Sequence, residues 1–393
     1  MTTLQQKPHY IVYGFAHFFV SALGQSFLLG MFKPYISAEF GFDGDDYSTY
    51  YSIICLMSGL TLPWVGPLVD RFKLRHVSLF AGGGLLLASL LMANTQSALL
   101  FFVVLFAIRF LGQAFIPLIA STGIARYFTT HRGKAISIAV LGLSLSEILF
   151  ASLLTEVIDH YSWRTAWYVL GGFVAFLFIP VVLLSVKSNS SFHYASTTKR
   201  STSRAEVLSN PKFYLYVLHY VFTPFVMTGY FILTQDIAAM KGWEGIKLVK
   251  LVAVYGIVRV GANFLSGPVI DRFTGYRVFK FANVPILLGL VVLLSSPSFN
   301  SAYVFIALFG ISVSFISASA TATWAETFGP AQLGAIKSVS STGMVLATSL
   351  GSFTIGWVLQ RVDHLAALFV PIIIVGLCLT LAVLFVPLVR REN

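Results

Sequence analysis

Three ionisable residues stand near the middle of long apolar segments, where a charge is difficult to accommodate: Arg109, Glu147 and Arg259. An ionised side chain at mid-membrane costs at least about 2.5–3.5 kcal/mol on insertion scales, so it faces a partner or a cavity and is a candidate for function. A guanidinium suits two-pronged binding of a carboxylate. A carboxyl group can take up and release a proton. These residues therefore predict a site that binds an organic anion and handles a proton.

Two interpretations remain open for each charge. Arg109 and Glu147 fall at similar depths in consecutive apolar segments, so an ion pair is geometrically possible. Either Glu147 takes a proton and frees Arg109 for an anionic substrate, or the pair is permanent and structural. For Arg259, the later apolar segments offer no obvious acidic residue at its depth, which favours a negative charge supplied by the substrate. The alternative is bonding of Arg259 to backbone carbonyls or to Glu147.

Two segments also carry polar residues at helical spacing, and each row predicts one face of a helix that lines a central cavity. The first row is His17, Ser21, Gly24, Gln25 and Ser26, and the second is His219, Thr223, Tyr230 and Thr234. Gln25 and Tyr230 are predicted substrate contacts. Histidine titrates near physiological pH, so His17 and His219 are candidates for proton coupling. The alternative is that each histidine is only hydrogen-bonded.

The segments that hold these residues are apolar enough to cross a membrane. Of 393 residues, 57% are hydrophobic and 10% are charged, whereas a soluble domain carries roughly 25% charged residues. A spanning helix needs about 20 mostly apolar residues, and the alternation of transmembrane strands is absent. The sequence predicts an all-α membrane protein with about twelve transmembrane helices in two pseudo-symmetric six-helix bundles. The helices begin near Tyr10, Asp46, Val77, Ala98, Lys134, Arg164, Pro211, Lys247, Arg277, Ser301, Gly334 and His364.

The basic residues predict the orientation in the membrane. With the N-terminus in the cytoplasm, eighteen of the 26 Lys and Arg residues fall on the cytoplasmic side and six on the external side. By the positive-inside rule, both termini are expected in the cytoplasm, in a bacterial inner membrane or a plasma membrane. The net charge of +11 then reflects topology and anionic lipid, and nucleic acid is not an expected partner.

A polar stretch rich in Ser and Thr divides the predicted helices six and six. Its composition is typical of a solvated connector, so the predicted parts are an N-terminal bundle (1–186), a cytoplasmic linker (187–210) and a C-terminal bundle (211–393). The bundles repeat one another at a spacing near 200 residues. The sequence GPLVDRF at 66–72 matches GPVIDRF at 267–273, and ARYF at 125–128 matches AETF at 325–328. The entries to helices 1 and 7, PHYIVY at 8–13 and PKFYLY at 211–216, also correspond.

These repeated motifs resemble those of the major facilitator superfamily. The G-x-L-x-D-R pattern lies at Gly66, Leu68, Asp70 and Arg71, with a weaker copy at Gly267, Asp271 and Arg272, and Arg109, Gly112 and Gln113 are similar to the helix 4 motif. The resemblance implies a cytoplasmic latch that holds the outward-facing state and breaks during transport. It assigns this gating role to the two Asp-Arg pairs, with Arg126 and Glu326 as partners. Ordinary juxtamembrane charge is the alternative.

Within the superfamily, the chain is similar to monocarboxylate and oxalate–formate type carriers. The similarity rests on Phe40-Gly41-Phe42, on Arg126-Tyr127-Phe128 with Arg132-Gly133, and on Tyr161-Ser162-Trp163-Arg164. The helix 8 arginine of those carriers would fall at Asn263, and here Arg259 lies one turn further outward on the same face. Both are therefore predicted substrate contacts. The helix 1 lysine of the animal carriers has no match, since Ser26 is near that place.

The sequence thus predicts a secondary transporter of a small organic anion such as a monocarboxylate, which works by alternating access with proton coupling. The alternatives are an exporter of an amphipathic compound, such as a siderophore or drug, and a non-transporting receptor. The Pro-Gly motif of helix 5 in drug/proton antiporters is absent from residues 136–157. No enzyme is expected, because the spans hold no paired catalytic constellation, and no cofactor is expected. No metal is expected either, since the acidic run at 43–46 has Ile54 in place of the final Glu of a Ca²⁺ loop. The chain is expected to act as a monomer in lipid.

Overall fold

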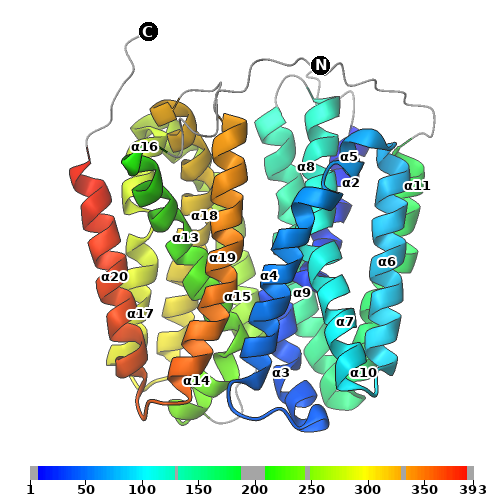
Figure 1. The fold of residues 1–393 in the computed structure, drawn as a ribbon, viewed down its shortest axis with the longest axis horizontal. Coiled ribbons are helices and arrows are strands. Elements are labelled where there is room, and N and C mark those ends of the chain that lie inside the picture. Colours follow the sequence, from blue (N-terminus) through cyan, green and yellow to red (C-terminus); the bar gives the residue numbers. More distant parts are fainter. Residues whose placement is uncertain (1–7, 129–131, 187–208, 244–247, 329–332, 387–393) are drawn as a thin grey trace. The chain divides into compact units, whose positions relative to one another are not determined.

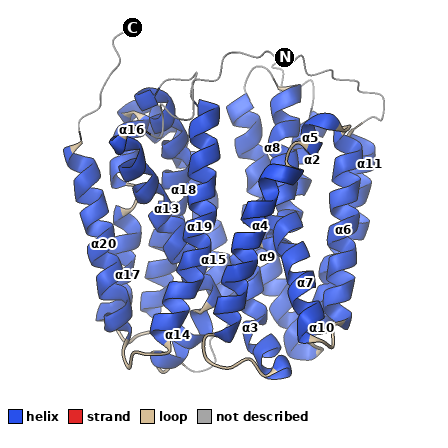
Figure 2. Ribbon diagram, in the orientation of Figure 1, coloured by secondary structure: helices blue, strands red, loops and turns tan. Residues whose placement is uncertain are grey.

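The computed structural model describes residues 8–128, 132–186, 209–243, 248–328 and 333–386, and every regular element in them is a helix (Figure 2). The chain divides into two compact units. One comprises residues 1–195 with 248–253, and the other comprises residues 196–247 with 254–393. The predicted linker at 187–210 lies outside the described residues as far as residue 208, so its role stays a prediction.

The first unit contains the helices that the sequence assigns to spans 1 to 6 (Figure 1). Spans 4 and 6 each contain a π-helical segment, and span 1 is interrupted by a 3₁₀ turn. The elements are α2 (Pro8–Val20), η1 (Ser21–Gly24), α3 (Ser26–Phe40), α4 (Asp46–Val65), α5 (Leu68–Arg71), α6 (Leu74–Asn94), α7 (Ala98–Ile108), η2 (Arg109–Phe115), α8 (Ile116–Tyr127), α9 (Arg132–His160), α10 (Trp163–Phe173), η3 (Val174–Phe178) and α11 (Ile179–Ser185).

The helices after the linker are longer and mostly uninterrupted. They are α13 (Pro211–Ile232), α14 (Thr234–Met240), α15 (Leu248–Phe273), α16 (Gly275–Phe281), α17 (Val284–Ser295), α18 (Asn300–Phe328), α19 (Leu333–Leu359) and α20 (Leu365–Phe385). Helix starts follow local capping chemistry. The side chain of Asn210 accepts a hydrogen bond from the backbone N–H of Lys212 at the start of α13, which satisfies one of the free amides of the first turn.

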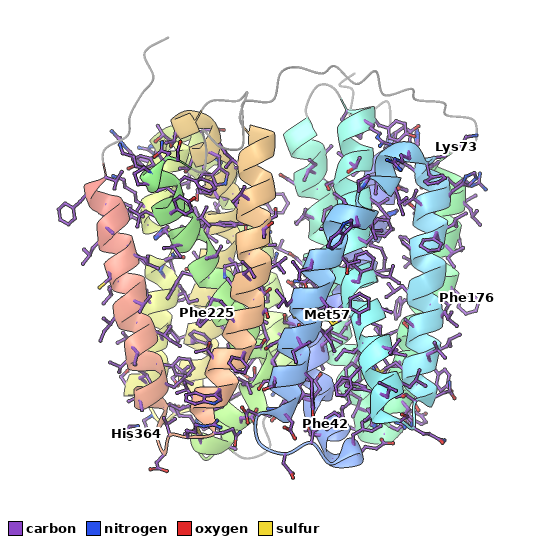
Figure 3. The ribbon with its side chains drawn as sticks, in the orientation of Figure 1. Phe42, Met57, Lys73, Phe176, Phe225 and His364 are labelled. Carbon is purple, nitrogen blue, oxygen red and sulfur yellow. The ribbon has the colours of Figure 1, made fainter. Side chains whose placement is uncertain are left out.

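Eleven helices of the described residues are long and apolar enough to cross a membrane. The remaining predicted span, α4, has 20 residues but is more polar, with several Ser, Thr and Tyr residues between its apolar ones. Side chains on the outer surfaces are correspondingly apolar: Phe176 is 87% exposed and points outward (Figure 3). Because water would not tolerate this many exposed apolar side chains, these surfaces face lipid.

Within each unit, the first long helix packs most closely on the fifth: α2 on α9, and α13 on α19. Both contacts depend on a glycine. A Cβ added to Gly142 would come far inside van der Waals distance of the Phe15 carbonyl oxygen, and a Cβ added to Gly351 would do the same at the Phe225 carbonyl oxygen. Small residues permit such close backbone approach in membrane proteins. The same packing device thus occurs in both units.

Candidate functional site

The first transmembrane segment is broken in its middle. After α2 the chain forms the 3₁₀ turn Ser21–Gly24, and Gln25 then adopts an extended conformation (φ −84°, ψ 150°) before α3 begins at Ser26. The Gln25 side chain makes no capping hydrogen bond. Interrupted helices in membrane proteins occur where the freed backbone is buried in protein or lines a ligand site. The sequence predicted a row of polar residues at regular helical spacing over residues 17–26, and the break at Ser21–Gln25 was not predicted.

A second irregular segment lies against this break. Helix 4 changes from α to π geometry over Arg109–Phe115, and such π segments are frequent at functional sites. The two irregular segments touch through glycines. A Cβ at Gly24 would lie 2.5 Å from the backbone nitrogen of Gln113, and a Cβ at Gly112 would lie 2.6 Å from the backbone nitrogen of Gly24. Any side chain at either position would separate the two backbones.

Arg109 joins the two segments from the first residue of the π segment. Its side chain is 1% exposed, and Nη1 donates to the carbonyl oxygen of Gly24 at 2.6 Å and to Oγ of Ser26 at 3.4 Å. The guanidinium carbon lies 5.0 Å from the ring centroid of Tyr51, within cation–π range. The Tyr51 hydroxyl in turn donates to Oγ of Ser26 at 3.0 Å. The backbone at the break therefore holds one nitrogen of the guanidinium, Nη1, in place.

The two other guanidinium nitrogens of Arg109 make no hydrogen bond to the described residues. Among the described residues, neither Nε nor Nη2 of Arg109 has a hydrogen-bond partner, although both atoms are buried. A buried, charge-bearing donor left in this state carries a desolvation penalty of about 1–3 kcal/mol or more. The first turn of α3 adds the partial positive charge of a helix N-terminus beside the same guanidinium. Chemically, this is a place that favours an anion.

The other residues predicted near mid-membrane lie as follows. Glu147 is buried on α9 at 2% exposure, while the Arg109 side chain donates to Gly24 and Ser26. Arg259 is 9% exposed on α15, with its guanidinium carbon 5.2 Å from the ring centroid of Tyr255. One turn along α15, Asn263 is half-buried. The substrate and proton roles of these residues remain predictions.

Tyr230 lies in an aromatic cluster inside its own unit. Its ring packs edge-on against Phe305 with centroids 4.6 Å apart, and Phe309 is also in contact. The side chain is 1% exposed. This environment is that of a core residue.

The two histidines have equivalent positions in the two units. Nδ1 of His17 bonds the Tyr13 carbonyl oxygen at 2.7 Å, and Nε2 bonds Oγ of Ser78 on α6 at 2.9 Å. Nε2 of His219 bonds the Phe279 carbonyl oxygen on α16 at 3.0 Å. Both side chains are fully buried. Each histidine therefore ties the first helix of its unit to the third, which accords with the hydrogen-bonded alternative.

A buried amide completes the contact in the second unit. Asn283 donates to the His219 carbonyl oxygen at 2.8 Å and accepts from the Thr223 hydroxyl at 2.6 Å. The polar row of helix 7 thus faces its neighbour α16–α17 at these two positions.

The predicted latch residues lie near helix ends, away from the break in helix 1. Nη2 of Arg126 donates to the Val69 carbonyl oxygen at 2.8 Å, beside the motif at 66–71. At the equivalent place in the second unit, the Glu326 carboxylate accepts from the backbone N–H groups of Gly275 and Tyr276 at 2.8 and 2.9 Å. The side chains of Arg71, Asp271 and Arg272 are exposed, and that of Asp70 lies outside the described residues. Gating by these residues remains a prediction.

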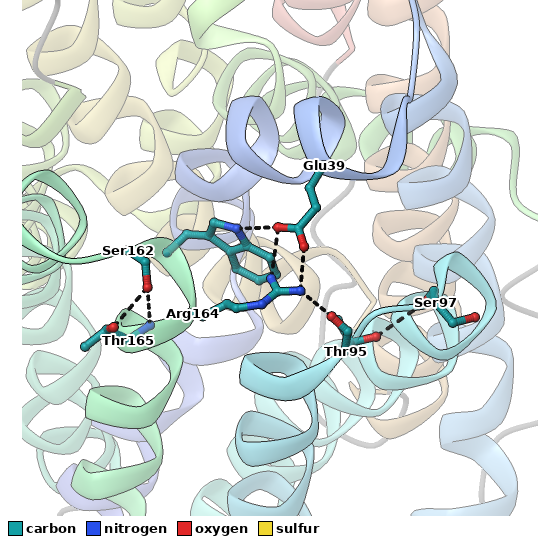
Figure 4. A network of polar contacts seen from close by, with 7 residues as sticks. Glu39, Thr95, Ser97, Ser162, Arg164 and Thr165 are labelled. Atoms are coloured by element: carbon teal, nitrogen blue, oxygen red, sulfur yellow. Dashed lines mark hydrogen bonds and ion pairs between the residues drawn. The ribbon is translucent and has the colours of Figure 1, made fainter.

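The other end of the first unit carries a charged network (Figure 4). Glu39 of α3 accepts from both terminal nitrogens of Arg164, at 3.0 and 2.6 Å, and from Nε1 of Trp163 at 3.0 Å. Arg164 also donates to the Thr95 carbonyl oxygen at the end of α6. The Trp163-Arg164 motif therefore binds the ends of helices 1, 3 and 6 together.

No metal-binding group of three His, Cys, Asp or Glu residues occurs in the part of the chain that the structure describes.

The sequence model described as Major Facilitator Superfamily matches residues 15–258 and 237–393. The chain belongs to the major facilitator superfamily. Two solved structures share its fold. The nucleoside transporter NupG superposes with a TM-score of 0.74 at 11% identity over 96% of this chain and 98% of that one. A bacterial homolog of the human lysosomal transporter Spinster, inward-facing and occupied, gives 0.67 at 13% identity, over 96% of each chain. The predicted all-α, multi-pass membrane fold is confirmed.

Several relatives carry the name monocarboxylate transporter. Monocarboxylate transporter 12 of Xenopus laevis is 24% identical over 249 residues, which are 56% of this chain and 53% of that protein. Monocarboxylate transporter 4 of Rattus norvegicus is 24% identical over 324 residues, 79% of this chain and 66% of that protein. The chain thus spans about half the length of the first relative. The predicted similarity to monocarboxylate carriers is confirmed.

Proposed function

We propose that this protein carries a small organic anion with a carboxylate group across the membrane by alternating access, coupled to protons. The observation that carries the proposal is the state of Arg109. One guanidinium nitrogen is held by the backbone of a broken helix, and the two others are buried donors with no hydrogen-bond partner among the described residues. A carboxylate accepts such a pair of N–H groups in a planar, two-pronged geometry. Its charge would offset that of the arginine.

Other observations support the same substrate class. The N-terminus of α3, which begins beside Arg109, is the kind of half-helix end that faces anionic substrates in transporters. Relatives named monocarboxylate transporters align with most of the chain. Arg259 is proposed as a second contact with the anion, and Glu147 as the carboxyl group that takes and releases the coupled proton.

The test is uptake by the purified full-length protein in liposomes with an imposed pH gradient, with a panel of radiolabelled monocarboxylates. We expect at least one monocarboxylate to accumulate when the gradient is present. Arg109→Gln removes the carboxylate contact and should reduce both accumulation and counterflow by at least about tenfold, the cost of losing one charge-assisted bond of 1.5–3 kcal/mol. Arg109→Lys keeps the charge but loses the two-pronged geometry, and we expect intermediate activity.

The matched control is Arg361→Gln, because this arginine is exposed near the end of α19. Gel filtration and a melting curve would verify that each variant folds. If folded Arg109→Gln transports every monocarboxylate in the panel like the unmodified protein, Arg109 is not the anion site. If no member of a wider anion panel exchanges at all, the proposed function fails.

A further inference from the structure

The second unit has an apolar groove of about 430 Å³ that plays no part in the site described above. It is formed where α15 ends and α16 begins, and residues of α17 and α18 also line it. The residues that shape it include Val269, Phe273, Arg277, Phe281, Pro285 and Phe315. All but one of its lining side chains are apolar. The exception is Arg277.

The position of the groove along the helices fits the depth of a single lipid leaflet. The adjacent candidate spans end at Phe273 and begin at Gly275, so the end of the groove lined by Phe273 and Arg277 is expected at the membrane boundary. Pro285 lies ten residues into the second span, or about 15 Å at 1.5 Å per residue. Half of a bilayer's hydrocarbon core is also about 15 Å thick. The groove is therefore as deep as one acyl chain is long.

The charge at the mouth is positive and available. The Arg277 side chain is exposed and has no hydrogen bond or ion pair among the described residues. Arg272 is also exposed, with its guanidinium carbon 5.4 Å from the ring centroid of Phe273, which lines the groove. Lys280 is turned elsewhere, since its Nζ donates to the carbonyl oxygens of Leu384 and Val386. The apolar groove therefore has one exposed guanidinium group in its lining, that of Arg277, and a second lies against its lining residue Phe273.

We propose that this groove binds an anionic glycerophospholipid, with one acyl chain along Phe273, Phe281 and Phe315 and the headgroup phosphate on Arg277. Basic residues where spans meet the cytoplasmic leaflet recognise anionic headgroups in this way. The predicted orientation puts Arg277 on that side, where anionic lipids are attracted to positive charge. The site is independent of the transported substrate.

The test uses the full-length protein, washed free of lipid in detergent, with dioleoyl-phosphatidylglycerol or dioleoyl-phosphatidylcholine added. We expect phosphatidylglycerol to raise the melting temperature by several degrees more than phosphatidylcholine, because a ligand that binds only the folded state stabilises it. Native mass spectrometry should show one retained phosphatidylglycerol. Arg277→Gln should abolish the difference between the two lipids, and Arg277→Lys should keep most of it.

Two further arms separate the parts of the proposal. Lys73→Gln removes an exposed cation from the equivalent loop of the first unit and should leave the lipid difference unchanged. Val278→Phe fills the groove and should weaken retention of phosphatidylglycerol while Arg277 is still present. The proposal is overturned if Arg277→Gln keeps the full preference for phosphatidylglycerol. It is also overturned if glycerophosphoglycerol, which has the same phosphodiester charge without acyl chains, stabilises the protein equally.

Discussion

At the scale of single residues, the sequence singled out ionisable side chains in apolar segments but did not predict the hydrogen bonds that they make. Arg109 was identified because a guanidinium in an apolar segment is costly. A pair with Glu147 was one interpretation of this residue, and the hydrogen bonds found for Arg109 go to a backbone carbonyl and a hydroxyl on helix 1. A carbonyl becomes available only when a helix is interrupted, and residue type and depth contain no information about that.

Glu147 can be tested separately from Arg109. Glu147→Gln removes the ionisable group and keeps nearly the same shape. We expect counterflow of the anion to persist at near-normal rates while accumulation driven by the pH gradient falls to the level seen without a gradient. The control is Glu156→Gln on the same helix, where the side chain is exposed. Normal gradient-driven accumulation by folded Glu147→Gln would rule out this residue as the proton carrier.

At the scale of elements, apolar runs located the helices well and missed their irregularities. The predicted starts at Asp46, Ala98 and Pro211 coincide with the observed starts of α4, α7 and α13. The break at 21–25 and the π segment at 109–115 were not predicted. Hydropathy reports which backbone lies in lipid, but a 3₁₀ turn, a π turn and an α-helix are equally apolar. The one available signal was a pair of glycines, Gly24 and Gly112.

The glycine contacts between the first and fifth helices of each unit make a prediction about stability. Gly142→Ala and Gly351→Ala place a methyl group against a backbone carbonyl, which has nowhere to move without shifting a helix. Overpacking of this kind costs about 1–3 kcal/mol, so each variant should melt at a lower temperature.

The controls for this prediction are Gly83→Ala and Gly172→Ala, two helical glycines with open space around the added Cβ. Their melting temperatures should be unchanged or slightly higher, since Ala favours helix over Gly. Equal effects at all four positions would mean that close approach of the helices is not what these glycines provide.

At the scale of the whole molecule, the two halves keep the same plan with different chemistry. Arg126 and Glu326 occupy matching positions with opposite charges. The first donates to a carbonyl of the short helix α5, and the second accepts from amides of the first turn of α16. The sequence repeat predicted the correspondence. It could not predict that both side chains bond to main-chain groups. Nearly every residue has a backbone N–H and C=O, so residue types do not reveal which of these groups is the partner.

The predicted orientation can be tested by labelling with a membrane-impermeant maleimide. In a background with Cys55→Ser and Cys378→Ser, Lys73→Cys should be labelled only after the membrane is permeabilised. His364→Cys, which lies in the predicted external loop before α20, should be labelled in intact cells (Figure 3). The reverse pattern would invert the topology and contradict the charge rule on which it rests.

The break in helix 1 has a mechanical consequence. Its first half, α2, is fastened to α6 through the bonds of Tyr13 and His17 to Ser78, and its second half, α3, is fastened to α10 through Glu39 and Arg164. Because α2 and α3 are each bonded to another helix, a rotation of one relative to the other must change the backbone conformation at Gly24–Gln25. Arg109 bonds directly to this connection through the Gly24 carbonyl oxygen. A ligand that drew the guanidinium toward itself would weaken its bonds to Gly24 and Ser26, so that ligand binding and rotation of the two half-helices would be linked through Arg109.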